Sequence, residues 1–222
     1  MVISWYGQSC FKIQSGELVL VSDPYHKDIG LTPPRFKADI LVVTHEHLDH
    51  NNIETIPTAG EIGGAFVVRG PGEYEVKNVA ITGIPTFHDD KKGKERGPNT
   101  CYVIEMEDIR IGHLGDFGEA EIRPETLEAL GEIDILLVPV GGTYTIDAEV
   151  AAEVVNAIEP KIVIPMHYAI SGIKAKLAGV GMFLKEMGIK NGEEMDRLTI
   201  KKKDLIDDNK SAKTVVLRPV NS

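Results

Sequence analysis

Short apolar runs, separated by turns rich in glycine, proline and polar residues, recur along the whole chain. Runs of alternating or β-branched apolar residues predict strands. These strands are expected at residues 2–6, 11–13, 18–21, 39–43, 65–69, 79–84, 99–105, 109–114, 133–138, 161–165 and 214–217. The first three predict an antiparallel meander, and residues 70–75 a hairpin or loop between the strands on either side.

Helical signals are concentrated in the second half of the chain. Pro124 suits a first helical turn, and Asp147 suits an N-cap. The helices are expected at residues 51–55, 123–130, 148–158 and 175–187. Strands and helices therefore alternate in two halves, which favours an α/β sandwich with two central sheets covered by helices, in a single domain over residues 1–222.

Composition narrows the class of protein. Hydrophobic residues make up 42% of the 222 residues and charged residues 26%, which are values of a globular domain. The net charge of -10 disfavours extended nucleic-acid binding, because that binding rests on an excess of lysine and arginine. The N-terminus has no signal-like run and no stretch is long enough to span a bilayer, so we expect a cytoplasmic protein without a membrane partner. Cys10 and Cys101 lie in apolar runs and are expected to be buried free thiols, with a disulfide as the alternative.

The strongest chemical signal is the stretch from Thr44 to Asn51, which directly follows the predicted strand at 39–43. His45 and His47 are two positions apart, so in extended chain their imidazoles point to one side. Asp49 and His50 follow as the chain turns, where they can face a second cation. Imidazole with some carboxylate suits zinc, with manganese or iron(II) as alternatives, and suits calcium poorly. The competing interpretation is a solvated, histidine-rich loop.

This stretch resembles the signature His-x-His-x-Asp-His of the metallo-β-lactamase-fold hydrolases. Within that superfamily the chain is most similar to the short, single-domain group that includes ascorbate-phosphate lactonase and N-acyl-phosphatidylethanolamine phospholipase D. The narrower resemblance rests on residues 3–11, Asp23-Pro24, Gly115-Asp116 and residues 165–168. It implies a four-layer αβ/βα sandwich of the metallo-β-lactamase type.

The resemblance also implies a complete ligand set for two divalent metal ions per chain, most simply Zn²⁺, with Mn²⁺ or Fe²⁺ as alternatives. Metal one would be bound by His45, His47 and His88, metal two by Asp49, His50 and His167, and Asp116 would bridge them. Each of these residues lies near the end of a predicted strand. The resemblance gives Asp23 a supporting hydrogen bond to the histidine cluster, although a plain turn aspartate is the alternative.

Two metals roughly 3.5 to 4 Å apart can share a water and lower its pKa toward neutrality, which makes hydroxide available as a nucleophile. Candidate catalytic residues are Asp49 and Asp116 themselves, together with Tyr168, Tyr144 and His113 near the ligands. His113 is interpreted as a support or core residue rather than a ligand. The charged loop at 89–97 either meets an anionic substrate or is simply solvated.

Three functions remain open. The first is hydrolysis of a small, anionic ester or lactone by a hydroxide held between two metals. The second is a phosphodiesterase acting on a nucleotide or a phospholipid head group. The third is a metal-binding partner domain without turnover, which the full ligand set disfavours. The short interval between Asp116 and His167 excludes the large inserted domain of RNA-processing members, and His47 disfavours the flavodiiron proteins, which carry an acid there. A homo-oligomer is compatible with the sequence.

Overall fold

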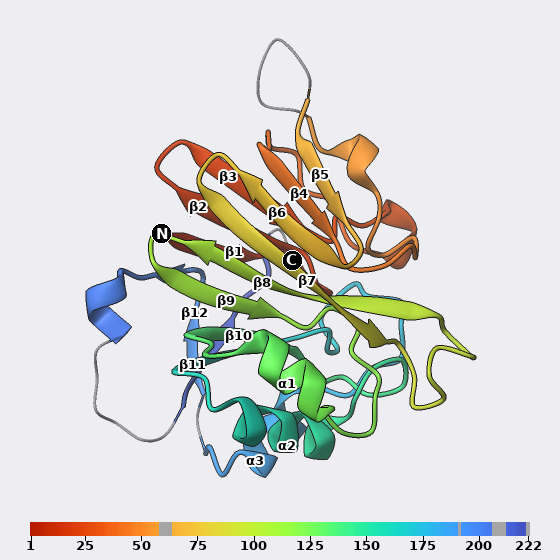
Figure 1. Cartoon of the computed structure of the whole chain (residues 1–222). Helices are drawn as coiled ribbons and strands as arrows, with labels where there is room; N and C mark the ends of the chain where they lie inside the picture. Colours follow the sequence, from red (N-terminus) through yellow and green to blue (C-terminus); the bar gives the residue numbers. More distant parts are fainter. Residues whose placement is uncertain (58–63, 191, 206–211, 221–222) are drawn as a thin grey trace.

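The computed structural model describes residues 1–57, 64–190, 192–205 and 212–220, and its strands form two sheets (Figure 1). The six-stranded sheet has the order β13 (Leu198–Thr199), β1 (Val2–Trp5), β2 (Phe11–Ser15), β3 (Leu18–Ser22), β4 (Ile40–Val43), β5 (Phe66–Arg69). The eight-stranded sheet has the order β12 (Glu193–Met195), β14 (Lys213–Leu217), β11 (Ile162–Met166), β10 (Ile135–Pro139), β9 (Ile109–His113), β8 (Pro98–Met106), β7 (Val79–Phe87), β6 (Gly72–Val76). The two sheets stack, as the sequence pattern predicts.

The core between the sheets follows from the alternation of apolar residues. In β1, Ile3 and Trp5 are buried while their neighbours along the strand are only half-buried. They belong to one cluster with residues of the second sheet such as Tyr102 and Ile104. Because side chains alternate across a strand, one face of β1 is committed to the second sheet.

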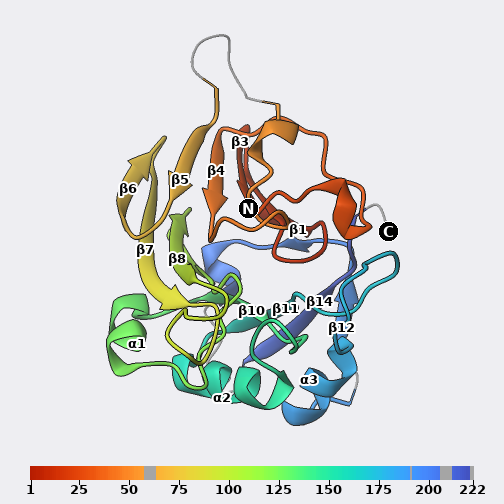
Figure 2. The same cartoon turned by 90° about the vertical axis from the view of Figure 1, so that its right-hand side faces the viewer.

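The outer layers of the sandwich differ from each other. Helices α1 (Pro124–Leu130), α2 (Ala148–Ile158) and α3 (Val180–Glu186) cover the outer face of the eight-stranded sheet (Figure 2). The outer face of the six-stranded sheet instead packs Val21 and Leu41 against Tyr25 and Ile56. In the described residues this layer consists of loops and the 3₁₀ turns η1 (Lys27–Ile29) and η2 (Ile53–Thr55). A third 3₁₀ turn, η3 (Lys202–Leu205), lies elsewhere in the sequence, between β13 and β14. The α/β sandwich is confirmed, and among the described residues one of its outer layers has 3₁₀ turns in place of α-helices.

Two predicted helices were wrong in type or extent. The helix expected at 175–187 begins only at Val180, because Ala178 bonds elsewhere: its N–H donates to Gly141 O at 2.8 Å and its carbonyl accepts from Ala169 N at 2.9 Å. The helix at 51–55 is the 3₁₀ turn η2. For residues 70–75 the hairpin alternative is confirmed, since β6 pairs antiparallel with β7. Among the described residues no helix is long and apolar enough to cross a membrane, and both cysteines are buried free thiols.

Parallel pairing brings several strand ends to one place. In the six-stranded sheet β3, β4 and β5 are parallel neighbours, and in the eight-stranded sheet β9, β10 and β11 are. The segments that follow the carboxyl ends of parallel strands lie along one edge of a sheet, which is where open α/β sheets carry their binding sites. Residues after β3, β4, β9 and β11 therefore meet at the seam between the two sheets.

A candidate metal centre at the seam of the two sheets

Seven side chains gather at this seam in two groups. The ligand atoms within each group lie within 4.8 Å of one another. The first group consists of His45, His47 and His88, and the second of Asp49, His50, Asp116 and His167. His45 to His50 follow β4, and the other three residues follow β7, β9 and β11. The structure thus brings together the seven expected metal ligands, with Asp116 in the second group.

Asp116 lies between the groups. Its Oδ2 is 3.3 Å from His88 Nε2 in the first group, and 3.3 and 3.2 Å from the Nε2 atoms of His50 and His167 in the second. Burial alone would raise the pKa of this carboxyl, but His167 and His50 outweigh it and hold the pKa well below its usual value. A buried carboxylate that faces both groups has the placement needed to bridge two cations.

Asp23 orients two of the histidines through contacts at their Nδ1 atoms. Asp23 Oδ2 is 2.9 Å from His50 Nδ1 and accepts a hydrogen bond from Thr44 Oγ1 at 2.7 Å. The Thr44 hydroxyl donates its only proton to Asp23, so in its contact with His45 Nδ1, at 3.0 Å, it is the acceptor. Both histidines therefore carry their proton on Nδ1 and turn Nε2 toward the centre. The supporting role predicted for Asp23 is confirmed.

The electrostatics of the histidines differ with their neighbours. Burial, followed by the nearby His50, lowers the pKa of His45 to about 2. Burial would also lower the pKa of His50, but Asp116, Asp49 and Asp23 outweigh it and raise that pKa well above its ordinary value.

In the described structure four buried imidazole nitrogens have no hydrogen-bond partner: His45 Nε2, His50 Nε2, His88 Nδ1 and His167 Nδ1. Unpartnered buried nitrogens are costly, and a set of imidazoles and carboxylates is the donor chemistry of zinc, so the residues fit a metal site.

Close backbone approaches hold the centre together. Gly115 has φ +57, and a Cβ there would lie 2.5 Å from Asn99 Oδ1 and 2.7 Å from Thr44 Cβ. Asn99 Oδ1 in turn accepts a hydrogen bond from Asp116 N at 3.0 Å. His167 itself has φ +51, a left-handed conformation that is uncommon for a residue with a side chain. Strain of this kind is typical of functional sites, where surrounding contacts enforce it.

The three remaining candidate catalytic residues have different surroundings. His113 is fully buried: its Nε2 donates to Ser9 O at 2.9 Å, and its Nδ1 accepts from Gly115 N at 3.0 Å, which makes it a support and leaves no nitrogen for a metal. Tyr168 packs its ring against Trp5, and its hydroxyl is 3.5 Å from Leu217 O. Its hydroxyl is committed to the core, so the structure gives no support for the catalytic role predicted from its position beside His167.

Gln8 is a residue of the centre to which the sequence gave no role in the site. It is 2% exposed, with Nε2 3.2 Å from Asp49 Oδ2 and 3.3 Å from His167 Nε2, while its Oε1 has no partner in the described part of the chain. The only sign of this role in the sequence is the polar segment Gly7-Gln8-Ser9, which interrupts two apolar strands. Ser9 Oγ likewise donates to Asp116 Oδ1 at 3.2 Å.

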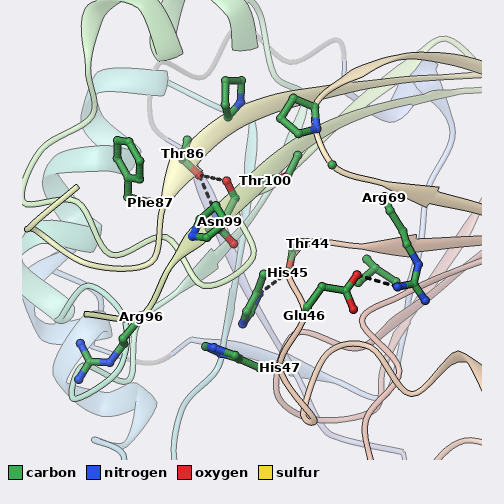
Figure 3. Close-up of a pocket in the computed structure, with 15 residues that line it drawn as sticks. Thr44, His45, Glu46, His47, Arg69, Thr86, Phe87, Arg96, Asn99 and Thr100 are labelled. Carbon is green, nitrogen blue, oxygen red and sulfur yellow. Dashed lines mark hydrogen bonds and ion pairs between the residues drawn. The ribbon is translucent and has the colours of Figure 1, made fainter. Parts of the chain in front are cut away.

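Two adjoining hollows open beside the ligands, and we call them together the groove. A hollow of about 480 Å³ lies against His45 and His47 (Figure 3). A second, of about 520 Å³, is lined by residues that include Asp116 and Tyr144. His47 and Arg96 line both hollows. Tyr144, the last of the candidate catalytic residues, lines the second hollow and is 42% exposed, so it belongs to the wall of the groove.

The comparisons with known proteins agree with this geometry. Residues 2–167 match the family model described as the β-lactamase superfamily domain. A UPF0173 metal-dependent hydrolase from Thermoplasma acidophilum is 35% identical over 188 residues, covering 75% of this chain and 82% of that protein. A crystal structure of a proposed Zn-dependent hydrolase of the metallo-β-lactamase superfamily from Thermotoga maritima has 34% identity and a TM-score of 0.76, and covers 97% of each chain. CmlA, a diiron β-hydroxylase from Streptomyces venezuelae, shares the fold alone, with 14% identity, a TM-score of 0.64 and coverage of 98% of this chain and 53% of its own.

Fold and donor set together define a metal-binding protein of the metallo-β-lactamase fold. The chain belongs to the β-lactamase superfamily domain family, and its relatives place it among the metal-dependent hydrolases of that superfamily. The narrower resemblance to ascorbate-phosphate lactonase and N-acyl-phosphatidylethanolamine phospholipase D stays a prediction.

Proposed function

We propose that the protein hydrolyses a small, anionic ester or lactone with two divalent metal ions, most simply zinc, held by the two ligand groups. The observation that carries the proposal is the position of Asp116 Oδ2, within 3.3 Å of histidines of both groups. When bound, the two ions would supply a hydroxide nucleophile near neutral pH and neutralise charge on the oxygen that it attacks. The remaining steps fall to side chains of this chain.

Asp49 is the carboxylate best placed to orient the nucleophile. It is half-buried, and its side chain lines the groove. Burial would raise its pKa, but the charge and hydrogen bond of His50 outweigh burial and lower the pKa, so Asp49 is ionised at neutral pH. Gln8 donates to Asp49 Oδ2 at 3.2 Å and so restrains the carboxylate, which reduces the cost of orienting it during the reaction.

The composition of the groove walls supports a small organic ester or lactone as the substrate. Pro85, Phe87 and Pro98 line the first hollow, and the exposed side chain of Leu48 lines the second. Apolar walls with a few polar groups are typical of sites for small organic molecules. His47 is exposed, so substrate can approach the ligands from this side. A phosphodiester with an organic leaving group would meet the same walls, and phosphodiester hydrolysis is the second candidate function.

The test compares a phosphorylated lactone with bis(4-nitrophenyl) phosphate, using zinc-loaded and manganese-loaded protein. Asp116→Ala is the inactive control, and Asp116→Asn keeps the shape of the side chain in case the alanine variant fails to fold. Faster lactone turnover, lost in both variants, would support the proposal. Faster phosphodiester turnover would favour the second function. A metal-loaded protein that turns over neither substrate would contradict both functions and favour a metal-binding partner domain.

A further inference from the structure

The charged loop between His88 and Pro98 is held in one shape by a buried carboxylate. Asp89 is 3% exposed, and its two oxygens accept four backbone hydrogen bonds. The donors are Lys91 N at 2.8 Å, Gly93 N at 2.9 Å, Glu95 N at 3.0 Å and Arg96 N at 2.7 Å. The loop is therefore an organised turn, and the backbone of Arg96 is fixed directly beside the groove.

Arg96 presents a cation to the groove without an acidic partner. Its Nη2 donates to Thr143 O at 3.1 Å, and the guanidinium lies over the ring of Tyr144, 5.6 Å from the ring centre. No carboxylate of the described chain lies within 4.0 Å of the guanidinium, although Glu95 lines the same hollow. A guanidinium has five N–H donors, so the single bond to Thr143 leaves most of them available.

The other arginine of the groove has a different environment. Arg69 and Arg96 lie on opposite sides of His45 and His47 (Figure 3). Arg69 Nη1 is 2.6 Å from Glu46 Oε1, so its charge is already matched. In a protein with net charge -10, Arg96 is thus a local positive charge beside the candidate metal centre, held in place and not neutralised by a carboxylate. Such a charge attracts an anionic ligand.

We propose that Arg96 recognises the substrate by binding an anionic group, a carboxylate or a phosphate, that lies outside the bond that is hydrolysed. This inference rests on the proposed function, since it places the scissile ester at the metal centre and the anion on the wall of the groove. Asp89 supplies the positioning, and Thr143 and Tyr144 hold the guanidinium in a plane from which its free N–H groups can form paired hydrogen bonds with two oxygens.

The experiment uses two esters of matched shape and different charge. 4-Nitrophenyl hemisuccinate carries a carboxylate where 4-nitrophenyl 4-methylvalerate carries an isopropyl group. Both are assayed with metal-loaded wild type, Arg96→Gln, Arg96→Lys, and Arg35→Gln as the control for loss of one positive charge outside the groove. Glutamine keeps a long polar side chain with an N–H donor but carries no charge. We expect Arg96→Gln to raise KM for the hemisuccinate about tenfold or more, with a smaller rise for Arg96→Lys.

In both Arg96 variants the rise in KM should be smaller for the neutral ester than for the hemisuccinate, Arg35→Gln should leave both esters unchanged, and salt should weaken the preference of wild type for the anion. Equal losses on both esters would mean that Arg96 is only a structural clamp, and unchanged KM values would equally overturn the inference. Calorimetric titration with N-phenylsuccinamate, the amide analogue, separates the two proposals. If no ester is hydrolysed but this anion binds wild type more tightly than Arg96→Gln, the proposed function fails and the anion site stands. If it binds both equally or neither, the anion site is refuted.

Discussion

The Asp23 carboxylate lies 2.9 Å from His50 Nδ1, with both side chains fully buried. This contact decides which nitrogen of His50 faces the metal centre. Asp23 also accepts hydrogen bonds from Thr44 N at 2.8 Å and Thr44 Oγ1 at 2.7 Å, and through that hydroxyl it reaches His45. One carboxylate therefore orients one histidine of each ligand group.

The first prediction concerns Asp23→Asn. An amide cannot accept every hydrogen bond that the carboxylate accepts, so the Nδ1–H tautomers lose their support. We expect metal affinity to fall roughly 10- to 100-fold, measured by competition with a chromophoric chelator. The control is Asp39→Asn at the other end of β4, where the carboxylate accepts from Val19 N and Lys77. Unchanged affinity in Asp23→Asn would refute the orienting role.

The second prediction concerns Gly115→Ala. Its new Cβ would approach Asn99 Oδ1 to 2.5 Å, whereas Gly16 has a similar φ of +55 and no atom within 4 Å of an added Cβ. Gly16→Ala is thus a matched control for the left-handed backbone alone, which costs about 1 kcal/mol. We expect Gly115→Ala to lower the free energy of unfolding by about 2 kcal/mol more than Gly16→Ala, in urea titrations, and to reduce metal content. Equal effects in both variants would contradict a steric role.

The third prediction concerns the dependence of stability on pH through Asp134. This buried carboxylate accepts from Arg110 N at 2.9 Å, Lys161 Nζ at 2.7 Å and Lys202 Nζ at 2.8 Å. Burial would raise its pKa, but these three donors outweigh burial and lower it. Because the folded pKa is depressed, the stabilisation is complete above the unfolded pKa of about 3.9 and is lost as pH falls through the folded value.

Asp134→Asn should therefore lower the free energy of unfolding by about 2 kcal/mol at neutral pH, and the difference from wild type should shrink below about pH 4. Both proteins are unfolded with urea across this pH range, without added metal. The exposed Asp90, which pairs with Lys91, provides the control variant Asp90→Asn with a small effect. A difference that is constant down to the lowest pH would refute the assignment.

The fourth prediction tests whether the Tyr168 hydroxyl belongs to the core and not to the catalytic groups. Its hydroxyl makes one long contact, 3.5 Å to Leu217 O, and burial raises the pKa of the phenol. Tyr168→Phe should keep kcat and KM and lower the free energy of unfolding by about 1 kcal/mol or less. A loss of about 100-fold in kcat would instead return the hydroxyl to the catalytic groups.

The sequence predicted the parts of the site that depend on local spacing. His45, His47, Asp49 and His50 lie within six residues after a strand, so their proximity required no knowledge of the fold. His88, Asp116 and His167 followed from strand ends together with the resemblance. Gln8 was not assigned to the site, and for the loop that contains Arg96 the sequence left open whether it meets an anionic substrate or is solvated, because the neighbours of both residues in space are distant in sequence. Gln8, for example, contacts Asp49 and His167, and no spacing rule links these positions.

The sequence also predicted most of the fold, but not the extent of every helix. Alternating apolar residues indicated most strands and the two sheets. The helix expected at 175–187 was too long because the backbone of Ala178 bonds to Gly141 and Ala169, and such long-range partners leave no mark in the local sequence. Propensity describes a segment on its own, and here tertiary contacts decided its conformation.

The two sheets contribute different ligands. His45 to His50 follow a strand of the six-stranded sheet, and His88, Asp116 and His167 follow strands of the eight-stranded sheet. A cation held by both sets would tie the two halves of the sandwich together as a cross-link does. Folding and metal supply then become one equilibrium: a metal at 100 times its dissociation constant adds about 2.7 kcal/mol to the folded state. Metal-starved cells would thus hold less of the folded protein, in addition to less of its activity.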